Sequence, residues 1–174
     1  MSTRTVVRTI SLAVIALGAV TVAPRRLKAA TPSEVRSLRG LSGVEVVVET
    51  LAEELLASGL SAEQLRGELQ SRLQEKGIRI LTSGDRAPGR PWLYFRTAAV
   101  KNPNTPTLGY FVTVQLRQDV SLDRNPDSHC GASTWDASAG GFSTSDAIVA
   151  AVRNAAQDLA DGFATDFAAA NAKR

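Results

Sequence analysis

The chain has 174 residues, 44% of them hydrophobic and 21% charged, which is enough for one globular domain with one core. The formal net charge is +3, but 5 of the 20 basic residues precede position 30 and all 17 acidic residues follow it. The remaining chain is therefore slightly acidic, which argues against nucleic-acid binding, because a surface that binds phosphate backbones needs clustered positive charge.

The first 29 residues have the pattern of an export signal or leader. Two arginines precede an uncharged, largely apolar run of 14 residues, 10–23. A membrane-spanning helix needs about 20 apolar residues, so this run is short for a span. The pattern predicts cleavage after Gly18 or after Ala29 and an exported mature protein, periplasmic or extracellular. An uncleaved leader that anchors the chain to a membrane is the alternative.

Residues 30–43 combine glycine, serine and proline with few apolar side chains, which predicts a tether between leader and domain. A single α+β domain is then expected over residues 44–174. Its first strand is expected at 44–51, where β-branched residues predominate. Residues 52–59 fit either an extension of that strand or a short helical turn.

A helix is predicted from Ser61 to about residue 76. Ser61 and Gln64 have the spacing of a capping box, in which each side chain bonds to the backbone N–H of the other residue. Leucines at four-residue spacing predict its buried face: Leu65, Leu69 and Leu73. Gly77 suits the left-handed position that ends a helix. Residues 78–81 resume an apolar, β-branched pattern and predict the second strand.

Two strands with alternating side chains are predicted next, after a loop at 83–91 that is rich in turn-forming residues. Within 92–100, odd-numbered and even-numbered positions form the two faces of the first strand. Within 110–120, the apolar residues expected to face the helices fall at even-numbered positions: Tyr110, Val112, Val114, Leu116 and Val120. Half-polar alternation of this kind is typical of antiparallel strands with one solvated face.

The last part of the chain predicts one further strand and a long helix. Residues 121–128 are polar and predict a loop, and residues 130–138 predict a strand that ends at the glycine pair 140–141. Ser143 and Asp146 have the spacing of a helix start. Apolar residues then recur at spacings of three and four: Ile148, Val152, Ala155, Leu159, Phe163, Phe167 and Ala170.

The predicted order is strand, helix, strand, strand, strand, strand, helix. It indicates the α+β class, as a two-layer sandwich in which two helices cover one face of a mostly antiparallel sheet of four or five strands. The other face of that sheet is expected to be solvated.

No catalytic, metal or cofactor site is predicted. His129 is the only histidine and Cys130 the only cysteine, and adjacent residues of a strand point to opposite faces, which argues against a Cys/His catalytic pair. One histidine and one cysteine are too few for a zinc site, and residues 123–127 lack the later glycine and glutamate of a calcium loop. Cys130 is interpreted as a small buried residue of a strand.

Two groups of side chains are candidates for function. The first shares one face of a predicted strand and is proposed as a binding site: Trp92, Tyr94 and Arg96. It could hold a ring or a peptide, or it could simply cover the sheet. The second lies on or near the first strand: Glu45, Glu49, Glu53 and Glu54. These carboxylates could line a cleft for acid–base catalysis, but a solvated edge or face explains them more simply.

Several stretches together resemble a known group of proteins: 43–49, 59–65, 73–81, 133–135 and 161–171. The chain resembles a widespread group of small, uncharacterised, exported bacterial proteins. Because the matching residues are caps and core positions, the resemblance implies export and no catalytic residue. In the order of its elements alone, the chain is also similar to the lipopolysaccharide-transport lipoprotein of the outer membrane and to the amino-terminal domain of the Tol-system propeller protein.

The sequence therefore predicts an exported, non-enzymatic domain that binds a protein partner or a component of the cell envelope. The alternatives are a hydrolase-type enzyme that uses the acidic residues of the first strand, and a carrier of a small ligand in an apolar cavity between sheet and helices. No cofactor and no nucleic-acid partner is expected. Contact with a membrane is expected only through an uncleaved leader, and no oligomeric state is favoured.

Overall fold

The computed structural model describes residues 25–172, which contain one five-stranded sheet. The strands in chain order are β1 (Arg25–Lys28), β2 (Glu45–Val48), β3 (Trp92–Lys101), β4 (Thr107–Leu122) and β5 (Asn125–Thr144). Across the sheet their order is β1-β5-β4-β3-β2. Neighbouring strands are antiparallel except β2 and β3, which are parallel, so the sheet is mixed.

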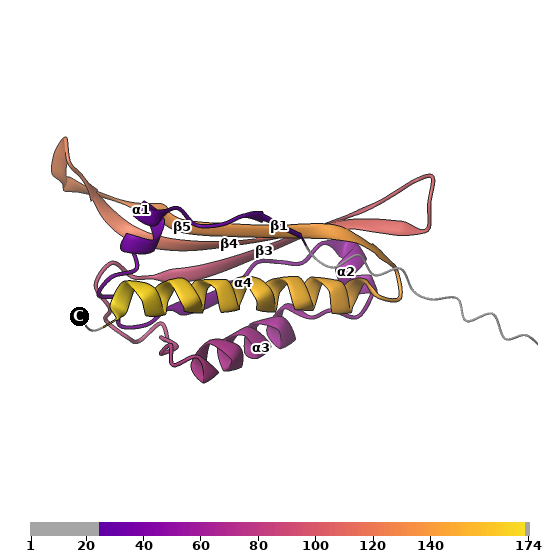
Figure 1. Ribbon diagram of the computed structural model, residues 1–174, viewed down its shortest axis with the longest axis horizontal. Helices are drawn as coiled ribbons and strands as arrows, with labels where there is room; N and C mark the ends of the chain where they lie inside the picture. The colour runs from indigo at the N-terminus through magenta and orange to yellow at the C-terminus, as the bar shows by residue number, and fades with distance from the viewer. Residues whose placement is uncertain (1–24, 173–174) are drawn as a thin grey trace, which may run out of the picture.

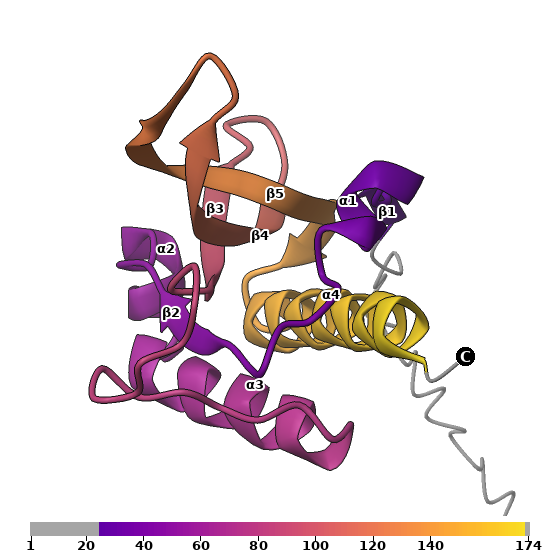
Figure 2. The ribbon, with the colours of Figure 1, turned by 90° about the vertical axis from the view of Figure 1, so that its left-hand side faces the viewer.

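Within these residues, the helices are α1 (Pro32–Arg36), α2 (Glu53–Ala57), α3 (Ala62–Glu75) and α4 (Ile148–Asn171). Helix α4 lies across β4 and β5, and α3 lies beside it next to β2, so the two longer helices form one layer (Figures 1 and 2). No helix of the described chain lies across the opposite face of β3, β4 and β5. The α+β prediction is thus confirmed. None of these helices is both long enough and apolar enough to cross a membrane.

The core lies between the sheet and the layer of α3 and α4. Its largest fully buried side chains include Trp135 of β5, Phe95 of β3 and Phe163 of α4. The rings of Trp135 and Phe163 meet edge to face, with centroids 5.1 Å apart, a favoured arrangement of aromatic pairs. The Trp135 indole N–H donates to the Asp166 carboxylate at 3.0 Å, so the one polar atom of the buried tryptophan side chain has a partner.

Helix α3 begins and ends as predicted. The Ser61 hydroxyl accepts a hydrogen bond from the Gln64 backbone N–H at 3.3 Å. The capping box is incomplete, because the Gln64 side chain accepts from Arg153 of α4. Gly77 has a φ of 79°, and the Ile78 N–H donates to the carbonyl of the last leucine of the helix, as in a Schellman motif. The predicted face is fully buried: Leu65, Leu69 and Leu73.

The prediction of a second strand at residues 78–81 is wrong. This segment forms a single parallel bridge, between Ile80 and Val44, and β2 takes β3 as its partner instead. The two segments approach very closely before that bridge, because a Cβ on Gly43 would lie 2.4 Å from the Arg79 carbonyl oxygen. The chain from 78 to 81 therefore passes beside β2 without adding a strand to the sheet.

Strand β5 is much longer than the strand predicted at 130–138. The loop predicted at 121–128 is wrong, because β4 and β5 continue as a hairpin almost to their tight turn. The glycine pair 140–141 lies inside β5 rather than at its end. A Cβ on Gly140 would lie 2.8 Å from the Tyr110 carbonyl oxygen, so glycine permits the close approach of β4 at this point.

Helix α4 has the predicted apolar face but begins later than predicted. Ser143 is a buried residue of β5, and the helix starts at Ile148 with Ala147 as its N-cap. The buried positions follow the predicted spacing of three and four residues. Residues 52–59, which fitted either of two states, contain the short helix α2, which buries Leu55.

Residues 25–43 are part of the fold. Strand β1 pairs with residues 138–140 of β5, α1 contacts α4 and β5, and Leu38 is fully buried. The tether predicted at 30–43 is therefore wrong, since a capped helix and a buried leucine fix this segment to the core. Residues 1–24 hold most of the predicted leader and lie outside the described residues, so the leader stays a prediction.

The junction of β1 and α1 contains a carboxylate whose ionisation should make stability depend on pH. Glu34 accepts hydrogen bonds from the Thr31 backbone N–H at 2.6 Å and from the Lys28 ammonium at 3.0 Å. These bonds, the Thr31 N–H above all, lower the pKa of Glu34 to about 2 from an ordinary value of 4.5. A pKa that is lower in the folded state means that this stabilisation is complete above the unfolded-state pKa and is lost as the pH falls through the folded-state pKa.

We therefore expect Glu34→Gln to destabilise the protein at neutral pH and to have little effect near pH 2. Urea unfolding followed by circular dichroism, repeated between about pH 7 and about pH 2, measures this difference. The control is Glu53→Gln, which removes an exposed carboxylate from α2. A Glu34→Gln effect that stays constant over the whole pH range would contradict the assignment of the pH dependence to this carboxylate.

Candidate functional site

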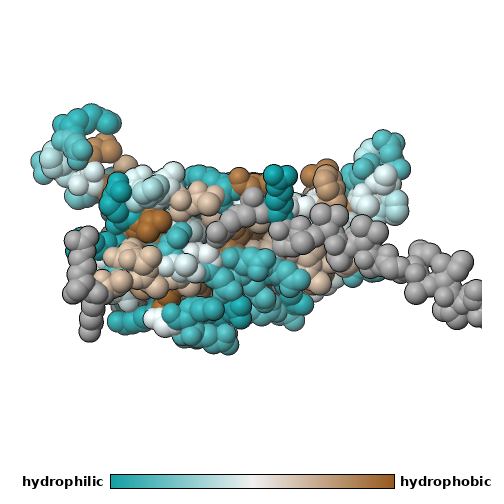
Figure 3. Space-filling model, in the orientation of Figure 1, coloured by the Kyte–Doolittle hydropathy of each residue, from teal (hydrophilic) through white to brown (hydrophobic). Residues whose placement is uncertain are grey.

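The face of the sheet opposite the helices, here called the uncovered face, carries alternate side chains of β3, β4 and β5. Cross-strand neighbours form two rows near the β3–β4 turn: Ala98, Phe111 and Gly140 in one, and Val100, Gly109 and Phe142 in the other. Because successive strand residues alternate between faces, the side chains of both rows point away from the core. Figure 3 shows hydrophobic side chains along the upper side of the molecule, over these strands.

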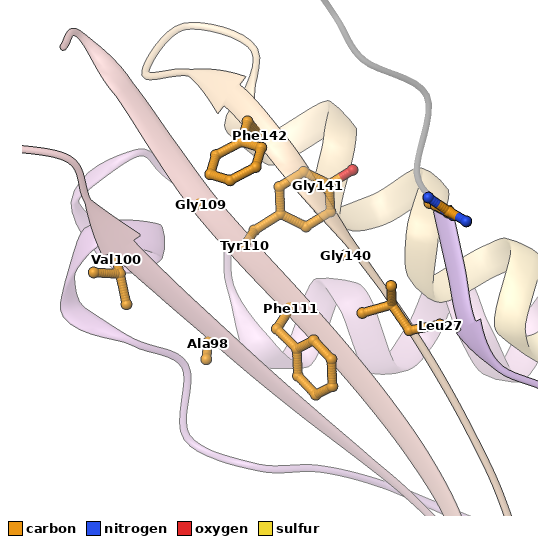
Figure 4. Close-up of a pocket in the computed structure, with 10 residues that line it drawn as sticks. Leu27, Ala98, Val100, Gly109, Tyr110, Phe111, Gly140, Gly141 and Phe142 are labelled. Carbon is orange, nitrogen blue, oxygen red and sulfur yellow. The ribbon is translucent and has the colours of Figure 1, made fainter.

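An apolar groove of about 480 Å³ lies on the uncovered face beside the β3–β4 turn (Figure 4). The residues that line it include Arg25, Leu27, Val100, Phe111 and Phe142. The four hydrophobic members are 56%, 69%, 40% and 60% exposed in that order. Among the described residues, the other large exposed hydrophobic side chain is Leu56 of α2. Exposed apolar side chains gathered in this way mark an interaction surface.

The groove follows from glycines placed under its aromatic rings. A Cβ on Gly109 would lie 3.5 Å from Cε1 of Phe142. A Cβ on Gly140 would lie 3.3 Å from Cδ2 of Phe111 and 3.4 Å from Cδ1 of Leu27. Each ring therefore lies over a glycine of a neighbouring strand, where a larger residue would compete for the same space.

The predicted binding residues lie on the same face of β3, farther from the β3–β4 turn: Trp92, Tyr94 and Arg96. The guanidinium of Arg90 lies 5.1 Å from the centre of the Trp92 ring, and that of Arg117 lies 6.0 Å from the centre of the Tyr94 ring. These distances suit cation–π contacts. The Nε of Arg96 donates to the Glu49 carboxylate at 2.6 Å. The three residues share one surface with the groove, and their role in binding stays a prediction.

The glutamates of the enzyme alternative do not gather in one cleft. Glu45 lines a polar pocket of about 300 Å³ together with Asp85, whereas Glu49 is held in the ion pair just described and Glu53 is exposed on α2. The Asp85 carboxylate accepts from the Thr82 backbone N–H at 2.8 Å, and this bond lowers the pKa of Asp85. Over residues 25–172, no three His, Cys, Asp or Glu side chains are grouped so as to hold a metal ion.

The prediction that Cys130 is buried is wrong. Cys130 and His129 are exposed on the hairpin arm, the part of β4 and β5 over residues 117–133, which projects from the body of the molecule (Figure 2). Cys130 pairs with Val120 across the arm. The arm extends beyond the helical layer, so an apolar position in its strands does not imply burial.

Sequence analysis missed the groove because its walls come from segments that are far apart in the chain. Phe111 lies on the solvated face of a predicted strand, Phe142 follows the glycine pair at which a strand was expected to end, and Leu27 was assigned to the leader. A signal was nevertheless present. A phenylalanine at a solvent-facing strand position is unusual enough to suggest a contact surface.

Comparison with known proteins was made for both sequence and structure. No family model matches the sequence, and no curated protein matches it. Among solved structures, the chain is similar to a PelC dodecamer from Paraburkholderia phytofirmans, with 13% sequence identity and a TM-score of 0.43. The likeness covers 87% of this chain and 98% of the PelC chain. At this distance the likeness carries no argument about function.

Proposed function

We propose that this chain is an exported, non-enzymatic domain that binds a protein partner or another component of the cell envelope through its uncovered face. The observation that carries the proposal is the apolar groove, where four large hydrophobic side chains are exposed together. Monomeric domains rarely leave such side chains contiguous unless a partner or ligand covers them. Export is supported by the leader pattern of residues 1–29.

Covering the groove would contribute favourable free energy to binding. Complete burial of a Leu, Val or Phe side chain is worth about 1.5–3 kcal/mol. The four groove side chains are already partly buried, so each would contribute a share of that value. Association costs about 4–15 kcal/mol in lost translational and rotational freedom, and the contributions of the four side chains together offset part of that cost. The neighbouring Trp92, Tyr94 and Arg96 are of the residue types that dominate binding energy at interfaces.

The two alternatives are less well supported. A hydrolase would need a carboxylate free to exchange protons in a cleft, and the pocket with Glu45 contains an Asp85 carboxylate already engaged by backbone and side-chain donors. A carrier was expected to hold its ligand between sheet and helices, whereas the apolar groove lies on the opposite face and is open to solvent. Binding of a partner across an open face fits this geometry better.

Photo-crosslinking from the groove in intact cells tests the proposal. Phe142→p-benzoylphenylalanine keeps an aromatic ring in the groove and makes it photoreactive. The matched control is Leu56→p-benzoylphenylalanine, since Leu56 is an exposed hydrophobic residue outside the groove. We expect a light-dependent adduct with an envelope component from position 142 and little or none from position 56.

Adding Val100→Asp to the photoreactive chain should remove the adduct, because it places a charge on the wall of the groove. Equal adduct yields from positions 142 and 56 would indicate random collision. That outcome, or the absence of any adduct from position 142, would contradict the proposed function.

A further inference from the structure

We infer that the apolar groove docks on an anionic lipid surface, with its exposed hydrophobic side chains in the lipid and Arg25 beside the headgroup phosphates. This inference rests on the proposed function, because it names the envelope component that the uncovered face contacts. It commits to lipid rather than to a protein segment for three reasons: the shape of the groove, the charges around it, and the place where the chain enters it.

The hydrophobic side chains of the groove project outward rather than enclose a cavity. Val100, Phe142 and Leu27 each expose more than half of their surface, at 69%, 60% and 56%. They lie at the end of the sheet that carries the β3–β4 turn, away from the hairpin arm (Figures 1 and 4). Protruding apolar side chains next to basic groups are the composition of surfaces that lie at the boundary between lipid headgroups and tails.

The charges around the groove favour an anionic surface. Arg25 is the charged side chain that lines the groove in the described part of the chain, and no carboxylate lines it there. Three carboxylates elsewhere near the uncovered face pair with basic neighbours: Glu49 with Arg96, Asp136 with Lys28, and Asp119 with Arg90. Glu45, beside Trp92, is the farthest from the groove along β2 and β3. Arg25 forms no ion pair with the described residues. Its guanidinium group is therefore available to phosphate oxygens.

The chain enters the groove directly from a long uncharged run. Residues 10–23 carry no charge, one proline separates them from Arg25, and Arg26 and Lys28 follow. An apolar run followed at once by clustered basic residues is typical of segments at an anionic lipid surface. The inference takes the alternative in which the leader is uncleaved, since a cut after Ala29 would remove Arg25 and Leu27 from the groove. Because each residue spans at most about 3.6 Å, an uncleaved run held at such a surface would bring Arg25 and the groove within reach of the same surface.

A fluorescent probe in the groove tests this inference on the full-length chain. Cys130→Ser leaves an introduced cysteine as the sole thiol. Val100→Cys, labelled with an environment-sensitive fluorophore, reports on the groove, and Leu56→Cys with the same label is the control. On vesicles of phosphatidylglycerol and phosphatidylcholine, we expect a blue shift and quenching by spin-labelled lipid for the probe at 100. The probe at 56 should show neither change.

Two further substitutions separate the charged and apolar parts of the contact. Arg25→Gln should lower partitioning onto the anionic vesicles roughly fivefold, the effect of one basic residue near such a surface. The same substitution should leave partitioning onto pure phosphatidylcholine unchanged. Phe142→Asp should abolish the blue shift of the probe at 100, because it places a charge among the groove side chains that meet the lipid.

The inference is overturned if the chain sediments with vesicles while the probe at 100 is unchanged, since the leader alone would then account for binding. If the probe is unchanged but photo-crosslinks to a protein still form from position 142, the lipid inference fails and the proposed function stands. If neither probe nor crosslink responds, both fail.

Discussion

Replacing Phe163 with alanine should lower the free energy of unfolding by about 3–5 kcal/mol. The Phe163 side chain is fully buried between α4 and the sheet and meets Trp135 edge to face at 5.1 Å. Its removal leaves a cavity under the largest buried ring of the core and deletes an aromatic pair, which is worth about 0.5–1.5 kcal/mol beyond its buried area. Domains have only about 5–15 kcal/mol of stability in total, so the loss should be plain in urea unfolding.

The matched control is Phe142→Ala, which deletes the same atoms at a position that is 60% exposed. More than half of Phe142 stays exposed to solvent, whereas Phe163 is fully buried, so Phe142→Ala should cost far less than Phe163→Ala. Equal losses of stability would show that α4 does not pack on the sheet through Phe163.

Leu69→Ala should lower the free energy of unfolding by about 2–5 kcal/mol. Leu69 is the central member of the buried face of α3, and the leucines one turn before and one turn after it are also fully buried. Those neighbours belong to the same helix and cannot move into the space, so the site collapses poorly and the cavity persists.

Thermal or urea unfolding of Leu69→Ala beside Gln74→Ala measures this effect. Gln74 is exposed on the same helix, so its replacement tests helix propensity without changing the core. If Gln74→Ala were the more damaging substitution, the face of α3 assigned to the core would be wrong.

The parts of the fold that could be predicted are those determined by neighbouring residues. The cap at Ser61, the leucine spacing and the left-handed Gly77 all act within a few residues, so the bounds of α3 are visible in the sequence alone. Alternation within 92–100 likewise separated the two faces of β3, and alternation within 110–120 identified the face of β4 that meets the helices. The β4 prediction is confirmed over 110–116, where the even-numbered residues are buried, whereas Val120 is only half-buried.

The parts that could not be predicted depend on partners far away in the chain. By its immediate neighbours in the sequence, the glycine pair 140–141 was predicted to end a strand. In the structure it lets β4 approach closely, and Tyr110 lies against it. Residues 30–43 have the composition of a tether, yet Leu38 is buried in the common core, and the Asn171 side chain of α4 donates to its carbonyl. No local pattern reports such contacts.

The candidate site likewise has one part that could be predicted from neighbouring residues and one part that could not. The sequence placed Trp92, Tyr94 and Arg96 on one strand face, because alternation within a strand is a local property. The groove beside them depends on strand order and register, which bring Leu27 of β1 and Phe111 of β4 to the two sides of Gly140. Those pairings are set by the tertiary fold, so the residues next to Leu27 in the sequence do not indicate them.

The order of the strands also has a consequence for the time course of folding. Strands β3, β4 and β5 follow one another and pair in sequence, whereas β1 pairs with β5 from the opposite end of the described chain. Hairpins close in microseconds, while pairings between distant segments form more slowly because a long loop must be closed first. We expect the three-stranded meander to form early and β1 to dock late. Leu27 would then join the groove only in the last steps, so the groove becomes complete when folding is nearly finished.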